Sequence, residues 1–309
     1  MKHFDIIHCI DENYAPQCGV TITSICLNHM DVDITFHIMF ANLSNSTKHK
    51  LVKQAESYGK SVKLYQIDIK ELDNSPLGGG KELPIAAYFR LLATDYLPKD
   101  IHRALYLDVD IVVCKSLTDF YNTDLTNWPV AGVYDISTLD EAPSKRLDYD
   151  FKLGYINSGI MLINVDYWRK NNIKQKCLDF LEAYRDKLMF HDQDVLNGSL
   201  AGSIKIMPLE YNVQKHFYDP GFEKNMPANF TQNFNDTLNK PAIIHFTESE
   251  KPWSTYSTHP MCKQWWYYAK RSLWKRSFPI LPKNANLYMK LRWLLIHLGF
   301  PIQSISLHR

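Results

Sequence analysis

Short apolar runs alternate with longer amphipathic stretches along the first third of the chain. Strand-like runs at 4–10, 34–40 and 62–67 enclose helical patterns at 17–28 and 46–58. Strands and helices that alternate in this way are typical of a parallel sheet covered by helices. The pattern therefore predicts an α/β fold, in which ligands bind beyond the carboxyl ends of the strands.

The rest of the chain continues the same alternation. The run at 103–113 is rich in valine and leucine, which is typical of a strand buried on both faces. Residues 136–152 are polar and of mixed charge, which predicts a surface loop or lid, and the three glycines at 78–80 predict a flexible loop. The remaining predicted elements are helices at 84–97 and 166–189 and strands at 130–135, 155–164, 204–208 and 242–246.

Two aspartates stand within the run at 103–113. On a strand, side chains two residues apart point to the same side, so Asp108 and Asp110 are expected to aim the same way. Two like charges in an apolar interior repel each other, so an arginine, a lysine or a metal ion must offset them. Paired oxygen ligands suit Mg²⁺ or Mn²⁺, but two aspartates can also cap a turn or pair with an arginine. Arg90, the only Lys or Arg in the helical pattern at 84–97, could reach either the aspartates or a diphosphate.

Composition and charge narrow the class of protein. The chain has 309 residues, of which 45% are hydrophobic and 22% charged, as in ordinary globular proteins, and no uncharged apolar stretch approaches the length of a spanning helix. The six cysteines form no C-x-x-C pair and the chain starts directly with a strand-like run, which predicts reduced thiols and a cytoplasmic protein. The formal net charge of +2 conceals a basic tail, because ten Lys and Arg and no Asp or Glu follow residue 250.

Several spaced motifs together resemble one known family. They are the D-x-D motif in Leu105–Asp110, Asn157-Ser158-Gly159, His191-Asp192-Gln193-Asp194, and His245 followed by Lys251-Pro252-Trp253, and their order is that of glycosyltransferase family 8. Asp11-Glu12-Asn13-Tyr14 and Arg90 also fit, so the resemblance covers about residues 4–260. The chain is similar in particular to the bacterial galactosyl- and glucosyltransferases that build lipopolysaccharide and related surface glycans.

The resemblance implies a fold, a donor and a set of site residues. The implied fold is GT-A, a Rossmann-like, mixed but mostly parallel sheet flanked by helices. The implied reaction transfers galactose or glucose from UDP-galactose or UDP-glucose with retention of configuration. The implied metal is Mn²⁺, with Mg²⁺ as the alternative, held by Asp108, Asp110 and His245. Implied donor-binding residues are Tyr14 on uracil, Asp11 and Asn13 on its edge and ribose, Lys251 on the diphosphate, and also Arg90, Asp108, Val109 and Asp110.

The residues implied around the donor sugar are Asp135, Asn157, Asp192 and Gln193. Taken alone, Asp192 could instead cap the helix that follows it. Gln193 is an amide and a poor nucleophile, which favours a front-face mechanism in which the acceptor hydroxyl attacks from the side that UDP leaves. The chain departs from many relatives at Glu248, where they have a glycine whose amide meets a phosphate, so Glu248 is not included in the site.

The basic tail predicts a second functional surface. Aromatic residues and cations alternate at 265–276 and 288–298, which is typical of a helix that lies on anionic lipid, although such a segment can also bind nucleic acid or pack on the acidic body. We expect a catalytic domain at 1–260 and a membrane-associating segment at 261–309, at the inner face of a bacterial plasma membrane. The expected partners are a UDP-sugar and a saccharide or glycolipid acceptor, and no nucleic acid.

Two other classes of function share some of these features. Asp108 to Val112 also resembles the D-x-D-x-[TV] motif of haloacid-dehalogenase-type phosphatases, which usually carry it on the first strand rather than about the fourth. A membrane-bound carbohydrate-binding protein with a degenerate site is the non-enzymatic alternative. It is disfavoured because every implied metal ligand is present.

Overall fold

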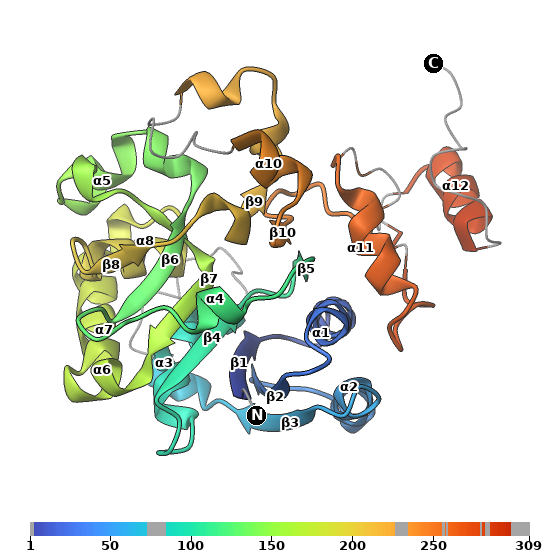
Figure 1. Cartoon of the computed structure of the whole chain (residues 1–309), viewed down its shortest axis with the longest axis horizontal. Coiled ribbons are helices and arrows are strands. Elements are labelled where there is room, and N and C mark those ends of the chain that lie inside the picture. The colour runs from blue at the N-terminus through green and yellow to red at the C-terminus, as the bar shows by residue number, and fades with distance from the viewer. Residues whose placement is uncertain are drawn as a thin grey trace.

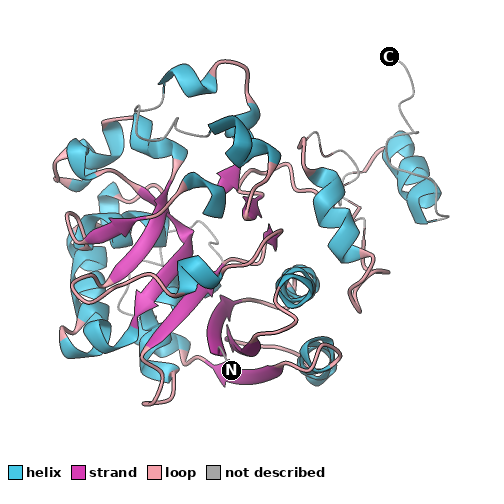
Figure 2. Ribbon diagram, viewed as in Figure 1, coloured by secondary structure: helices cyan, strands magenta, loops and turns pink. Residues whose placement is uncertain are grey.

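The computed structural model is built on a central seven-stranded sheet with helices on both faces (Figure 1, Figure 2). The strand order is β3-β2-β1-β4-β7-β6-β8, and all neighbours are parallel except β7, which is antiparallel to β4 and β6. The predicted mixed, mostly parallel α/β sheet is therefore confirmed. The structure describes residues 3–72, 85–225, 234–254, 257, 259–278, 280–281 and 285–297.

A second, three-stranded sheet lies beside the first, with β10 between an antiparallel β5 and a parallel β9. The strands are β1 (His3–Cys9), β2 (Asp33–Phe40), β3 (Ser61–Gln66), β4 (Arg103–Leu107), β5 (Ile111–Val113), β6 (Val130–Tyr134), β7 (Ile156–Asn164), β8 (Ile204–Ile206), β9 (Val213–Gln214) and β10 (Ile243–His245). The predicted loop at 78–80 lies outside the described residues.

The helices at Ala15–Asn28 and Asn45–Glu56 lie where the pattern predicts them, but other segments differ from the prediction, and α4 and α10 were not predicted. The predicted helix at 166–189 is divided at Asn171–Asn172, because Asn172 has a left-handed backbone with φ of 50°. The predicted loop at 136–152 contains a short helix, α5. The helices are α1 (Ala15–Asn28), α2 (Asn45–Glu56), α3 (Phe89–Tyr96), α4 (Thr118–Tyr121), α5 (Ala142–Leu147), α6 (Val165–Lys170), α7 (Ile173–Ala183), α8 (His191–Ser199), α10 (Phe234–Asn239), α11 (Cys262–Ala269) and α12 (Leu287–His297).

Alternate residues of the central strands pack into two different cores. Ile6 and Leu105 face the layer that contains α1 and α2, whereas Ile7 and Tyr106 face α3, α6, α7 and α8. This alternation follows from the period of two along a strand. All six cysteines are free.

The first part of the C-terminal segment belongs to the core that contains α1. Trp265 on α11 is fully buried, and Trp274 packs so closely on Gly19 of α1 that a Cβ there would clash with its ring. The backbone N–H of Leu273 also donates to Gln54 Oε1 on α2 at 2.7 Å. The rings of Trp265 and Trp274 therefore cannot form the lipid-facing surface expected of them, because packing on the body already buries them. The division at residue 260 stays a prediction, and α12 projects away from the rest of the chain (Figure 1).

His8 on β1 is a buried, neutral histidine. Its Nδ1–H donates to the carbonyl oxygen of Leu107 at 2.7 Å, and its Nε2 has no hydrogen-bond partner among the described residues. Burial lowers the pKa of His8 to about 4 from its ordinary value of 6.5. The folded chain therefore binds a proton here at a lower pH than the unfolded chain does.

We expect acid to destabilise the fold through His8. Between pH 6.5 and about 4 the unfolded chain carries a proton on His8 that the folded chain lacks, so the free energy of unfolding falls as the pH falls. The loss over this window is about 3 kcal/mol. Urea unfolding at about pH 7 and about pH 4.5 measures it, and the His8→Leu variant should lose less stability than the wild type. An equal loss in both proteins would contradict the prediction.

Candidate active site

The chain changes sheets at the two aspartates of the D-x-D motif. Strand β4 of the large sheet ends at Leu107 and β5 of the small sheet begins at Ile111, so Asp108, Val109 and Asp110 form a turn between them. Thr21 of α1 holds this turn, with its Oγ1 3.0 Å from the carbonyl oxygens of both Val109 and Ile111. The prediction of one continuous strand at 103–113 is therefore wrong, because the polar turn crosses from one sheet to the other.

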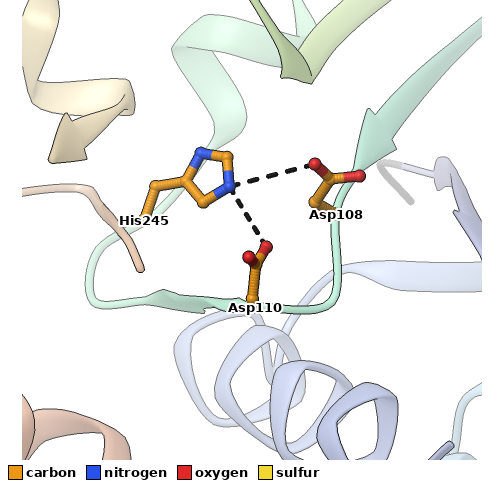
Figure 3. Close-up of side chains that lie close together, drawn as sticks. All are labelled: Asp108, Asp110 and His245. Atoms are coloured by element: carbon orange, nitrogen blue, oxygen red, sulfur yellow. Dashed lines mark hydrogen bonds and ion pairs between the residues drawn. The ribbon is translucent and has the colours of Figure 1, made fainter. Parts of the chain in front are cut away.

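Both aspartates nevertheless reach one histidine (Figure 3). His245 Nε2, at the end of β10, lies 3.1 Å from Asp110 Oδ1 and 3.9 Å from Asp108 Oδ2. The three potential ligand atoms all lie within 4.8 Å of one another, and no other such group of three occurs in the described ranges. Two carboxylate oxygens and one imidazole nitrogen are a donor set that suits Mn²⁺. The residues implied as metal ligands are thus brought together from β10 and the β4–β5 turn.

A glycine lets two of these residues pack directly against the backbone of β7. A Cβ on Gly159 of β7 would lie less than 3.0 Å from Asp108 Oδ2 and from His245 Cε1. The backbone cannot shift freely to relieve the contact, because the N–H of Asp108 donates to the carbonyl oxygen of Gly159 at 2.7 Å. Any larger residue at position 159 would therefore push Asp108 or His245 out of its present position.

Asp110 is held as an anion from two sides. Lys251 Nζ lies 2.9 Å from Asp110 Oδ2, and His245 contacts the other carboxylate oxygen. Burial acts to raise the pKa of Asp110, but the charge of Lys251 and the contact with His245 lower it below its ordinary value. Lys251 therefore lies beside the metal ligands, where the sequence predicted a cation for the diphosphate.

Arg90 of α3 joins the aspartate turn to α8. Its side chain is 7% exposed, and its guanidinium contacts Asp108 Oδ1 and Asp192 Oδ2, each at 3.0 Å. Burial acts to lower the pKa of Arg90, but the charges of Asp108 and Asp192 raise it above the ordinary value, so the group stays a cation. Burial raises the pKa of Asp192 to about 6 despite the charge of Arg90. The alternative in which an arginine offsets the aspartates is thus also realised, but only on Asp108.

The residues implied around the donor sugar form one hydrogen-bonded group. Asn157 Nδ2 lies 2.9 Å from Asp135 Oδ2 and 3.2 Å from Gln193 Oε1, and the N–H of Ser158 donates to the same Gln193 oxygen at 3.1 Å. The Ser158 hydroxyl donates to Asp192 Oδ2 at 2.9 Å, so Asp192 accepts bonds from across the site. The beginning of β7 therefore aligns residues from three separate sequence motifs.

The residues implied for the nucleotide are less tightly joined. Asp11 Oδ1 accepts the backbone N–H of Tyr14 at 2.9 Å within its own turn, and Asn13 is exposed. Burial raises the pKa of Tyr14, and the charge of Lys251 acts to lower it. The ring of Tyr14 also meets Trp253 edge-on at 6.4 Å.

Glu248 is paired with basic residues of the segment after β9. Its carboxylate forms ion pairs with His216 at 2.5 Å and Lys215 at 3.5 Å, on the segment after β9. Its charge is therefore offset there, which agrees with leaving it out of the site.

Some site residues were not identified from the sequence. Ser158 and Gly159 stood in a quoted motif but received no role, and Tyr106, whose hydroxyl donates to Asp108 Oδ1 at 2.8 Å, looked like a core residue. Nothing in the sequence indicated that Asn212 and Gln214 lie near the site, because β9 has only two residues and was not predicted. The only pattern there is the order of amide, valine and amide at 212–214.

Comparisons with known proteins agree with this geometry. Residues 5–257 match the model of glycosyl transferase family 8. The chain is 32% identical over 259 residues to an Escherichia coli lipopolysaccharide 1,2-glucosyltransferase, covering 83% of this chain and 75% of that protein. It is 24% identical over 295 residues to a Salmonella typhimurium lipopolysaccharide 1,3-galactosyltransferase, covering 92% of this chain and 82% of that protein.

The fold comparison gives the same result. The crystal structure of the galactosyltransferase LgtC in complex with donor and acceptor sugar analogues superposes with a TM-score of 0.77 at 25% identity. The match covers 91% of this chain and 98% of LgtC. The predicted GT-A type of sheet is thereby confirmed.

Proposed function

The chain belongs to glycosyl transferase family 8 and is a glycosyltransferase, and from this premise we propose its donor, acceptor and mechanism. It transfers a hexose, galactose or glucose, from a UDP-sugar to a hydroxyl of a cell-surface glycan or glycolipid such as lipopolysaccharide. The names of two relatives, a glucosyltransferase and a galactosyltransferase of lipopolysaccharide, support this donor and acceptor class. The observation that carries the proposal is the group of Asp108, Asp110 and His245, whose potential ligand atoms lie within 4.8 Å of one another.

We assign the metal and the nucleotide to the edge where the two sheets meet. Asp108, Asp110 and His245 would hold Mn²⁺, or Mg²⁺ as the alternative, which when bound supplies positive charge to the departing diphosphate. Lys251 adds a second cation, and it lies 2.9 Å from Asp110, so it can exchange this partner for a phosphate. Tyr14 offers a ring for uracil, with Asp11 and Asn13 for its edge and the ribose. Arg90 keeps Asp108 oriented through the contact at 3.0 Å.

We assign the donor sugar to Asp135, Asn157, Asp192 and Gln193. The bond between the anomeric carbon and the diphosphate breaks as the acceptor hydroxyl forms a bond to that carbon from the same face, and the proton of this hydroxyl passes to the departing diphosphate. Gln193 Oε1 accepts two hydrogen bonds, from Asn157 and the backbone of Ser158, so the amide is fixed in one orientation. A fixed amide can stabilise positive charge on the sugar but is a poor nucleophile, which supports the front-face mechanism.

Release of UDP tests this function. The purified full chain is incubated with a panel of UDP-sugars, with Mn²⁺ and with EDTA, and we expect metal-dependent release of UDP from UDP-galactose or UDP-glucose. Release from neither sugar would contradict the proposed donor. A carbohydrate-binding protein with a degenerate site would release no UDP from any sugar. The phosphatase alternative is not supported by the family match, and phosphatase activity in the same panel would restore it.

We also propose that the protein is cytoplasmic and associates with the inner face of a bacterial plasma membrane through α12. Among the described residues, no helix is long and apolar enough to cross a bilayer. Leu287, Leu291 and Leu294 are exposed by 74%, 52% and 47%, and their spacing places them on one face of α12. Lys290 and Arg292 flank them, and a basic helix with an exposed apolar face suits anionic lipid.

Charged substitutions on this face should weaken membrane binding. We expect the Leu291→Glu/Leu294→Glu variant to bind vesicles of anionic phospholipid about tenfold more weakly. Partial burial of two leucines in the lipid is worth roughly 1–2 kcal/mol, and the variant loses this contribution. UDP release should remain unchanged, since α12 stands apart from the site. Cosedimentation measures the binding, and Leu273→Glu, an exposed leucine outside α12, is the matched control. Equal binding by the variant and the control would contradict the role of α12.

A further inference from the structure

Two buried amides stand at strand β9. Asn212 and Gln214 flank Val213, which is fully buried in the core with α1 and α2. Asn212 directly precedes β9 and Gln214 is its last residue, and β9 pairs in parallel with β10, the strand that ends at His245. Asn212 is inaccessible and Gln214 is 1% exposed. Buried amide groups need hydrogen-bond partners, and both of these amides find a partner in the candidate active site.

Asn212 contacts a metal ligand. Its Oδ1 lies 2.9 Å from His245 Nδ1, on the opposite side of the imidazole from the two aspartates. An oxygen acceptor requires a proton on Nδ1, and a neutral imidazole with that proton has its free lone pair on Nε2. Nε2 is the atom that faces Asp108 and Asp110. Asn212 therefore selects the one neutral form of His245 that can bind a metal between the aspartates.

The other atom of the Asn212 amide shows that this contact is retained at a cost. Asn212 Nδ2 is buried and has no hydrogen-bond partner among the described residues. A leucine of similar volume would avoid this unpaired donor, so packing alone gives no reason for an asparagine here. The contact with His245 does give a reason for an asparagine at this position.

Gln214 contacts the sugar side of the site. Its Nε2 donates to Asp135 Oδ2 at 3.1 Å, and the same oxygen accepts Asn157 Nδ2 at 2.9 Å. The backbone N–H of Ser137 donates to the other oxygen of Asp135. Gln214 therefore completes the set of donors that holds the Asp135 carboxylate in one orientation.

We propose that Asn212 and Gln214 are positioning residues of the transfer reaction, the first acting through His245 on the metal and the second through Asp135 on the donor sugar. This inference rests on the proposed function, since it needs a metal at His245 and a sugar at Asp135. It adds that one short strand orients both halves of the site, and that the two effects are separable.

Binding of Mn²⁺ tests the proposed role of Asn212 without catalytic turnover. The electron paramagnetic resonance signal of free Mn²⁺ gives its Kd for the full chain in the presence of UDP. We expect Asn212→Leu to raise this Kd by about 10- to 100-fold. Asn212→Asp should remain close to wild type, because its carboxylate still accepts the Nδ1 proton. Gln54→Leu replaces a buried amide on α2, remote from the site, and should bind Mn²⁺ as the wild type does.

The outcomes separate the possible errors. Wild-type affinity in Asn212→Leu would overturn the inference alone. Equal losses in Asn212→Leu and Asn212→Asp would also overturn it, since a conservative variant then fails to rescue. A wild-type protein that binds no Mn²⁺ even with UDP would overturn the metal assignment of the proposed function, and the role of Asn212 with it.

The proposed role of Gln214 is tested by comparing its effect on turnover of the UDP-sugar with its effect on binding of free UDP. We expect Gln214→Leu to keep the Kd for Mn²⁺ and the inhibition constant of free UDP, but to lower kcat for release of UDP from the UDP-sugar about tenfold. Gln214→Glu should lower it further, because a carboxylate would face Asp135. A parallel change in the inhibition constant of UDP, or an unchanged kcat, would overturn the role of Gln214.

Discussion

The Asp108→Asn variant is expected to release UDP from the donor about 10³-fold more slowly than the wild type. The substitution removes one of two anionic ligands, and a metal that neutralises a departing diphosphate contributes several kcal/mol, of which about 4 kcal/mol corresponds to this factor. Asparagine keeps an oxygen that can accept from Arg90 and Tyr106, which now contact Asp108 Oδ1 at 3.0 and 2.8 Å. The loss should therefore be functional rather than structural.

The comparison with EDTA makes this prediction specific. The rate of Asp108→Asn with Mn²⁺ should approach that of the wild type with EDTA, because a site with one anionic ligand fewer holds the metal poorly. Asp166→Asn, which replaces an exposed carboxylate on α6, is the control and should keep the full metal-dependent rate. A variant at Asp108 that still responds to Mn²⁺ would show that this carboxylate is not a ligand.

The fold class could be predicted from the order of strands and helices. The turn between β4 and β5, the feature that matters most for the site, could not. The sequence of 103–113 is apolar enough to continue as one strand through Asp108 and Asp110. Its hydrophobic period does not report that β5 pairs with β10, which lies about 130 residues further along the chain. Pairing with so distant a strand determines where the first strand ends. The two carboxylates converge because of the turn, and not because of the period of a single strand.

The site residues divide in a similar way. Charged residues in recognisable motifs, such as Asp110, His245 and Lys251, were implied by the resemblance to the family, and the structure places them in contact. Residues that act by small size or by a single hydrogen bond could not be predicted. Asn212 resembles any buried polar residue until its distance of 2.9 Å from His245 is known. The tail shows the opposite error, because Trp265 has the sequence context of a lipid-facing residue but packs in the core.

Gly159→Ala is expected to weaken Mn²⁺ binding about a hundredfold without unfolding the protein. The added methyl group would lie less than 3.0 Å from Asp108 Oδ2 and from His245 Cε1, in two of the three residues proposed to hold the metal. Overpacking of a well-ordered site costs typically 1–3 kcal/mol, and here Asp108 or His245 must move to relieve it. Either movement separates ligand atoms that now lie within 4.8 Å of one another. Release of UDP should fall in the same proportion.

Gly132→Ala is the matched control for this variant. Gly132 lies on β6, next to β7 in the same sheet, and a Cβ there would meet the terminal carbon of Ile156 at 2.5 Å. The two substitutions therefore add the same atom to adjacent strands, but only one adds it beside the metal ligands. We expect both variants to lose some thermal stability and only Gly159→Ala to lose Mn²⁺ affinity. Wild-type Mn²⁺ affinity in Gly159→Ala would mean that Asp108 and His245 do not hold the metal.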